Sequence, residues 1–175
     1  DTAAVTRNFI KLGFNPFYPK GDDMSGVAEN PIPNLGHYRF VEFPIYNIFV
    51  YPLFLFFGVM DKLSRLVSVF FSLGSIIFIF LITKRYLGEV TSLLSALMFA
   101  ILPFSVFYSR TTLPEPTFIF FSLGMMYFGE SLIWDRKFFY PTLLFTMVAF
   151  LIKPWAIFFA IPLIYSYIKK EGRIW

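Results

Sequence analysis

The chain has 175 residues, of which 57% are hydrophobic and 15% are charged, and 26 of them are phenylalanine. Soluble domains are about 45–50% apolar and about 25% charged, so this composition excludes an ordinary water-soluble fold. The formal net charge is +4, but the basic residues occur in small clusters between apolar runs. That pattern is typical of membrane proteins, and we expect no nucleic-acid partner. The chain has no cysteine, which excludes disulfides and thiol catalysis.

The first 40 residues form the longest polar region of the chain. Apolar residues recur at helical spacing over residues 1–12, which predicts a short amphipathic helix. Residues 13–36 are rich in Gly, Pro, Asn and Asp, which predicts a loop. The chain opens with Asp1 and not with Met, so we interpret it as a fragment of a longer protein.

Long apolar runs follow this polar region, uncharged except for Glu130 in the run at 116–134. The run at 43–60 is interrupted by Pro44 and Pro52, which favours a short interfacial helix or a tilted span. Three further runs approach the roughly 20 apolar residues that a membrane span needs, at 66–83, 90–109 and 116–134.

The last apolar stretch, residues 138–168, is too long for one span. Pro154 disfavours helix at the residue before it, so we predict two short helices with a hairpin at Lys153. We therefore expect an all-α polytopic bundle over residues 63–175, preceded by an outer loop with short juxtamembrane helices over residues 1–62.

The basic clusters predict the orientation of the spans. Cytoplasmic loops of membrane proteins are enriched in Lys and Arg, so residues 1–62 are expected outside and the Lys84–Arg85 cluster inside. Following the chain through the later spans brings four charged residues to the outer side, far apart in sequence: Asp1, Glu42, Glu115 and Lys153. This convergence predicts a functional site at the outer membrane face.

Glu115 is flanked by Pro114 and Pro116 in the segment YSRTTLPEP, which holds its carboxylate on a stiff turn between two spans. Such a carboxylate suits contacts with a cation, a phosphate group or a hydroxyl. The alternative is a solvated loop carboxylate that pairs with Arg110.

Glu42 lies among large apolar residues in FVEFP, where a carboxylate is costly unless it binds a metal or pairs with a cation. The alternative is an exposed interfacial glutamate. Lys153 is an ionisable residue at membrane depth, which indicates a functional role such as contact with a lipid phosphate. The alternative is a lysine that extends its ammonium to the interface. Glu130 is interpreted as structural.

The ordered segments of this chain resemble the GT-C type membrane glycosyltransferases, in particular the protein-mannosyltransferase and aminoarabinose-transferase-like group, glycosyltransferase family 39 and its relatives. The segments that carry the resemblance are TAAVTRNFIKLGFNPFYP after Asp1, FVEFPIYNIFVYPLFLFFG, SRLVSVFFSLGSIIFIFLITKRYLG, SALMFAILPFSVFYSRTTLPEP and LIKPWAIFFAIPLI. They span nearly the whole chain.

The resemblance implies a GT-C type bundle that transfers a sugar from a polyprenyl-phosphate donor to a protein, lipid or glycan acceptor. It implies catalytic roles for Asp1 and Glu115 and contact of Lys153 with the donor phosphate. Arg110 and Tyr108 are expected to help bind the substrate, and Glu42 is expected to organise a divalent metal ion. The expected location is the plasma membrane of a bacterium or archaeon, with the active site outside. Family members usually carry a second acidic residue after the first, where this chain has Thr2.

Two other classes of function remain open at this stage. A secondary transporter or lipid flippase also places charges along a path through the membrane, but near the midplane. A non-catalytic membrane assembly subunit would show dispersed carboxylates.

Overall fold

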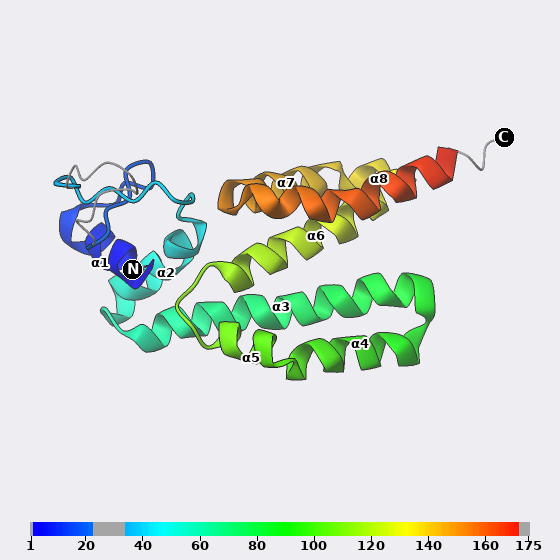
Figure 1. The fold of residues 1–175 in the computed structure, drawn as a ribbon, viewed down its shortest axis with the longest axis horizontal. Coiled ribbons are helices and arrows are strands. Elements are labelled where there is room, and N and C mark those ends of the chain that lie inside the picture. Colours follow the sequence, from blue (N-terminus) through cyan, green and yellow to red (C-terminus); the bar gives the residue numbers. More distant parts are fainter. Residues whose placement is uncertain (1, 23–33, 172–175) are drawn as a thin grey trace.

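The computed structural model describes residues 2–22 and 34–171, and within this part the chain is helical (Figure 1). An isolated antiparallel bridge joins Lys20 and Tyr38. The α-helices of the described residues are α1 (Thr2–Leu12), α2 (Ile45–Phe57), α3 (Asp61–Leu87), α4 (Glu89–Ile101), α5 (Pro103–Ser109), α6 (Glu115–Trp134), α7 (Phe139–Ile152) and α8 (Ile157–Glu171). Two short 3-10 helices, η1 (Arg136–Phe138) and η2 (Pro154–Ala156), precede α7 and α8. The predicted all-α class is confirmed.

Helices α1 and α2 pack against each other at one end of the molecule (Figure 1). The amphipathic pattern of α1 places Ala4, Val5 and Phe9 on its buried face. The predicted N-terminal helix is therefore confirmed. Helix α2 ends at Gly58, whose φ of 83° is readily adopted only by a residue without a side chain.

Helices α3 and α6 are long and apolar enough to cross a membrane. Helices α4 and α5 provide a third crossing if the bent pair is counted as one span. The sequence predicted one run at 90–109, but the chain bends by 60° between these helices. The reason is Pro103, which lacks a backbone N–H and holds Leu102 in an extended conformation, with ψ of 127°.

Helices α7 and α8 both pack against α6. Lys153 lies between α7 and η2 in an extended conformation, with φ of −149° and ψ of 132°. Pro154 imposes this conformation on the residue before it. The predicted division of residues 138–168 at Lys153–Pro154 is confirmed.

Aromatic and aliphatic side chains of α2, α3, α6 and α7 form a shared core, which includes Val50, Phe71, Phe121 and Ile152. The segment FFSLG occurs twice, at 70–74 in α3 and at 120–124 in α6, and each copy places its glycine at a close packing contact. A methyl group added at Gly74 would overlap the ring of Phe120, and one added at Gly124 would overlap the ring of Phe145.

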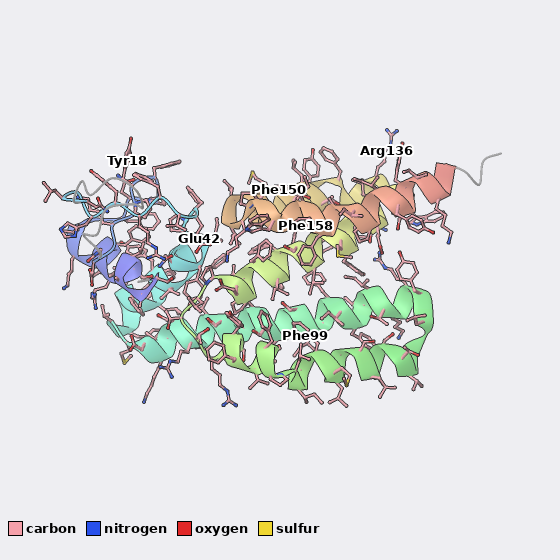
Figure 2. All side chains as sticks on the ribbon, in the orientation of Figure 1. Tyr18, Glu42, Phe99, Arg136, Phe150 and Phe158 are labelled. Carbon is pink, nitrogen blue, oxygen red and sulfur yellow. The ribbon has the colours of Figure 1, made fainter. Side chains whose placement is uncertain are left out.

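Many large apolar side chains project outward from the bundle (Figure 2), and Phe70, for example, is 68% exposed. Soluble monomers rarely expose such extensive apolar surface, so contact with lipid is the physical explanation. Glu42 lies at the end of the bundle next to α1 and α2, and Arg136 lies toward the other end (Figure 2).

Candidate functional site

Lys153 is the centre of a charged cluster that joins three distant parts of the chain. Its Nζ atom donates a hydrogen bond to Oε1 of Glu115 at 2.8 Å and lies 3.9 Å from Oε2 of Glu42. All three side chains are partly buried, with exposed fractions of 26%, 26% and 20% for Lys153, Glu115 and Glu42. The ammonium of Lys153 lies between two carboxylates, which argues against the alternative of a lysine that only extends to the interface.

Glu115 begins α6, directly after Pro114 and before Pro116. A carboxylate in the first turn of a helix is favoured by the helix dipole. The alternative, in which Glu115 pairs with Arg110, is wrong, because its partner is Lys153 and no ion pair with Arg110 occurs in the described part of the chain. Its second oxygen, Oε2, is buried and has no hydrogen-bond donor among the described residues. The carboxylate can therefore accept a further hydrogen bond from a hydroxyl, an amine or water.

Glu42 lies in the segment that leads into α2. The backbone N–H of Phe43 donates to the carbonyl of Leu151 at 3.3 Å, which ties this segment to the end of α7. Burial raises the pKa of the Glu42 carboxyl above its usual range, and repulsion from Glu115 adds to this, while the ammonium of Lys153 acts in the opposite direction. Burial has the largest effect, so Glu42 takes up a proton more readily than a solvated glutamate.

A polar network that the sequence did not reveal fixes the loop before Glu115. The hydroxyl of Tyr46, in α2, donates to the carbonyl of Ser64 at 2.7 Å. The hydroxyl of Ser68, in α3, lies 3.1 Å from the Tyr46 oxygen and 2.7 Å from the carbonyl of Thr111. Two helices thus hold the segment from which Glu115 projects.

A second network positions the start of α1. The side-chain amide of Asn47 donates to the carbonyl of Thr2 at 2.6 Å and to the hydroxyl of Thr6 at 2.8 Å. Thr2 and Glu42 line one narrow cavity together with Pro114. Asn47 is a polar residue in an otherwise apolar helix. A buried amide of this kind requires hydrogen-bond partners, so the sequence could have indicated the contacts with Thr2 and Thr6. Asp1, the predicted catalytic base, lies outside the described residues.

Tyr108 and Arg110 were predicted to bind the substrate. Tyr108 lies near the end of α5, and Arg110 directly follows this helix. Tyr108 packs against the rings of Phe104 and Phe107, with centroids 4.3 and 5.3 Å away. Arg110 is exposed. In the described part of the chain, no hydrogen bond or ion pair joins either residue to the Lys153 cluster, so their role stays a prediction.

The prediction of a divalent metal at Glu42 finds limited support from these residues. Within the described residues, no group of three His, Cys, Asp or Glu side chains is placed to hold a metal ion. Glu42 and Glu115 are the two carboxylates of the cluster, and the ammonium of Lys153 lies between them. The described residues do not fit a metal site by themselves, so no step below depends on one.

Comparison with known proteins agrees with this picture of an apolar helical bundle with the Lys153 cluster at one end. The family model described as dolichyl-phosphate-mannose-protein mannosyltransferase matches residues 44–175. The chain is an integral membrane protein and belongs to this family.

An uncharacterized protein of Aquifex aeolicus (strain VF5) is 34% identical over 94 residues, which is 53% of this chain and 23% of that protein. The aligned part thus spans less than a quarter of that relative's length. No solved structure matches the chain.

Proposed function

We propose that this chain carries the donor-phosphate part of the active site of a membrane glycosyltransferase. The enzyme transfers a sugar from a polyprenyl-phosphate donor to a protein, lipid or glycan acceptor. The observation that supports this proposal is the Lys153 ammonium, held at one end of the apolar bundle by Glu115. An ammonium at this depth suits a phosphate group whose lipid tail runs along the helices.

The hydrogen-bonding capacity of Lys153 supports contact with a phosphate. An ammonium has three N–H donors, and one of them is used by Glu115. Glu42, at 3.9 Å, is beyond hydrogen-bond distance, so donors remain for phosphate oxygens. Burial raises the pKa of Glu42, so its carboxyl takes up a proton more readily than a solvated glutamate, and protonation would lessen repulsion of an incoming phosphate.

The proposed reaction is an inverting displacement. Asp1 removes the proton of the acceptor hydroxyl or amine as this group attacks the anomeric carbon. The bond between that carbon and the phosphate oxygen breaks, and the polyprenyl phosphate leaves with the bonding electrons. Lys153 stabilises the negative charge that develops on the leaving phosphate. Glu115, with its second oxygen available, orients the acceptor, and Arg110 and Tyr108 flank the donor.

The position of the cluster favours an enzyme over a transporter or flippase. A transporter places its ionisable groups near the middle of the membrane. Here Glu115 begins one of the two long apolar helices, and Lys153 lies at the hairpin between α7 and η2, so both lie at helix ends. We propose that this end faces the outside of the plasma membrane of a bacterium or archaeon.

Replacement of Lys153 tests the proposal. In the full-length protein, Lys153→Met removes the ammonium, and we expect the rate of transfer from labelled polyprenyl-phosphate sugars to fall about 100-fold or more. Lys153→Arg keeps a cation next to Glu115 and is expected to fold normally and to retain more activity than Lys153→Met. The matched control is Lys137→Met, since Lys137 pairs with Asp135 in an exposed turn.

Rates are compared per amount of folded protein, measured by size-exclusion chromatography. Transfer by folded Lys153→Met at the wild-type rate would remove Lys153 from the mechanism.

Asp1→Asn tests the base. Asparagine keeps the size of the side chain but does not accept a proton, so we expect loss of transfer with unchanged expression and unchanged donor binding. The measurement is turnover together with retention of labelled donor on the purified full-length protein. Turnover at the wild-type rate would exclude Asp1 as the base.

A further inference from the structure

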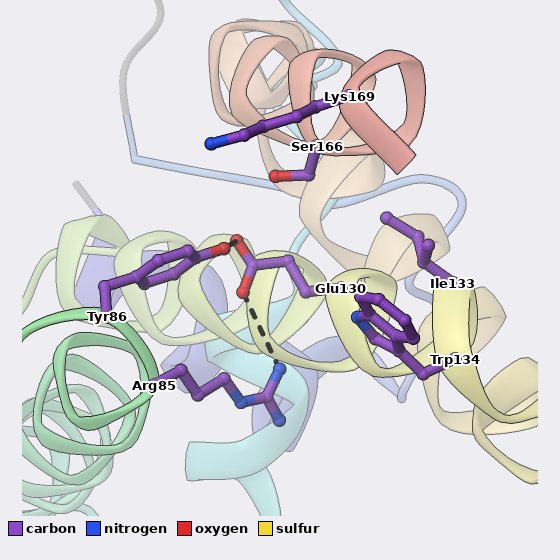
Figure 3. A pocket seen from close by; sticks show the side chains of 7 residues that line it. All are labelled: Arg85, Tyr86, Glu130, Ile133, Trp134, Ser166 and Lys169. Carbon is purple, nitrogen blue, oxygen red and sulfur yellow. Dashed lines mark hydrogen bonds and ion pairs between the residues drawn. The ribbon is translucent and has the colours of Figure 1, made fainter. Parts of the chain in front are cut away.

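A cavity of about 410 Å³ lies at the other end of the bundle from Lys153, between α3, α6 and α8 (Figure 3). Glu130 lines it near the end of α6, and Glu115 begins the same helix. At 1.5 Å per residue, these two glutamates are separated by about 22 Å along the helix. The cavity is therefore distinct from the Lys153 cluster and lies toward the opposite membrane surface.

Glu130 is buried in the wall of this cavity, with 6% of the residue exposed. The hydroxyl of Tyr86 donates to its Oε1 atom at 2.7 Å. Its Oε2 atom lies 3.6 Å from Nη1 of Arg85 and has no hydrogen-bond donor among the described residues. A buried carboxylate oxygen without a donor is costly, so a ligand that supplies an N–H or O–H group is favoured here.

The guanidinium of Arg85 also contacts Tyr127 and Ser131. Its Nη1 donates to the carbonyl of Tyr127 at 3.1 Å, and its Nη2 donates to the hydroxyl of Ser131 at 2.6 Å. The guanidinium also lies 3.9 Å from the centre of the Tyr127 ring. Arg85 thus balances the charge of Glu130 without completing its hydrogen bonding.

Lys169 lines the same cavity from α8, across from Glu130 (Figure 3). Its side chain is exposed. The cavity thus offers an ammonium on one wall and a hydrogen-bond acceptor on the other. Trp134 lies beside Glu130, and the face of its ring can attract a cation (Figure 3).

We propose that this cavity binds the headgroup of a phospholipid that carries a primary ammonium, as in phosphatidylethanolamine. The lipid phosphate pairs with Lys169, and the ammonium donates to Oε2 of Glu130 beside Trp134. A quaternary choline group has no N–H to donate, so it leaves this oxygen without a donor. A glycerol headgroup can donate an O–H to this oxygen but has no positive charge to offset the charges of its own phosphate and of Glu130.

Lipid competition on the full-length protein tests this assignment. Purified protein is mixed with equal amounts of lipids that share acyl chains and differ in headgroup, namely ethanolamine, choline and glycerol, and bound lipid is counted by native mass spectrometry. We expect the ethanolamine lipid to be retained about tenfold more than the choline lipid, the difference made by one charge-assisted hydrogen bond.

Two variants and one control locate the site. Glu130→Gln removes the negative charge, and Lys169→Gln removes the cation at an exposed position where folding is unaffected. Both are expected to abolish the preference for the ethanolamine lipid. Lys84→Gln is the control, because Lys84 pairs with the exposed Glu89 at the same end of α3 and does not line the cavity.

Equal retention of the ethanolamine and choline lipids, or a preference for the glycerol lipid, would overturn the proposal. If Lys84→Gln changed lipid retention as much as Lys169→Gln does, retention would depend on the overall surface charge and not on this cavity. That result would also overturn the proposal. Displacement of the lipid by an equal concentration of soluble phosphoethanolamine would show that the ligand is not a lipid.

Discussion

Lys153 shows how the energy of a charged residue at membrane depth depends on the partners it finds. Alone, its ammonium would carry a large desolvation cost. Glu115 supplies a direct hydrogen bond and Glu42 a second nearby charge, and both carboxylates in turn would be costly without the lysine. Lys153 therefore stabilises both carboxylates and is stabilised by them, and each of the three residues depends on a different segment of the chain for its position.

The raised pKa of Glu42 leads to a prediction for pH. Its folded-state pKa lies above 4.5, the usual pKa of a solvated glutamate, so between these two values the folded protein binds more protons than the unfolded chain. The contribution of Glu42 to stability should therefore fall as pH rises from 4.5 through the folded-state pKa. Melting temperatures of the wild type and Glu42→Gln across this range measure it.

We expect the wild type to lose stability relative to Glu42→Gln as pH rises, because the amide does not ionise. Asp135→Asn serves as a comparison with opposite sign, since hydrogen bonds from Lys137 lower the pKa of Asp135. A constant difference between the wild type and Glu42→Gln at all pH values would contradict the burial of an ionisable Glu42.

At the scale of elements, the position of α1 depends on α2. The amphipathic face of α1 explains why it packs, but an apolar face alone allows a helix to slide or rotate. The two hydrogen bonds of Asn47 to Thr2 and Thr6 specify one register, because a buried amide without both partners is costly.

Asn47→Ala tests this role. We expect the free energy of unfolding to fall by about 1–3 kcal/mol, since the carbonyl of Thr2 and the hydroxyl of Thr6 lose a buried donor. Hydrogen exchange of the α1 amides should accelerate, while that of α3 and α6 stays unchanged. Asn15→Ala is the control, because Asn15 is an exposed loop residue. Unchanged exchange in α1 would show that apolar packing alone holds this helix.

At the scale of the whole molecule, the two polar sites lie at opposite ends of an apolar bundle. The Lys153 cluster joins α6, the hairpin before α8 and the segment before α2, whereas the Glu130 cavity lies where α3 and α6 end. Helix α3 has 27 residues and is thus about 40 Å long, enough to separate the two membrane surfaces. The basic residues Arg136 and Lys169 lie at the Glu130 end, which the positive-inside rule assigns to the cytoplasm.

Cysteine labelling tests this orientation, and residues 1–175 contribute no background because they contain no cysteine. Val41→Cys lies beside Glu42 at a position that is 75% exposed, and Arg136→Cys lies in the exposed turn before α7. We expect a membrane-impermeant reagent to label Val41→Cys in intact cells and Arg136→Cys only after permeabilisation. Labelling of both positions from the same side would contradict the separation of the two sites.

Much of the helical architecture followed from local properties of the sequence. Apolar runs near membrane length predicted α3 and α6, and Pro154 predicted the division between α7 and α8. Both features are determined by residues that are neighbours in the sequence. The meeting of Glu42, Glu115 and Lys153 at one end was also predictable, since the alternation of spans and basic clusters assigns each loop to a side. The 60° bend at Pro103 was missed, although the proline was visible, because apolarity alone does not distinguish a straight span from a broken one.

By itself, the sequence determined that this protein is a membrane bundle and which loops share a side, because hydrophobicity and charge act on each segment independently. Only the tertiary structure decided that Lys153 and not Arg110 is the partner of Glu115, and that Ser68 holds the Thr111 carbonyl. The structure alone also placed Lys169 across a cavity from Glu130 (Figure 3). Such pairings depend on distances of a few ångströms between helices, and these are set by how side chains interlock after the segments have come together.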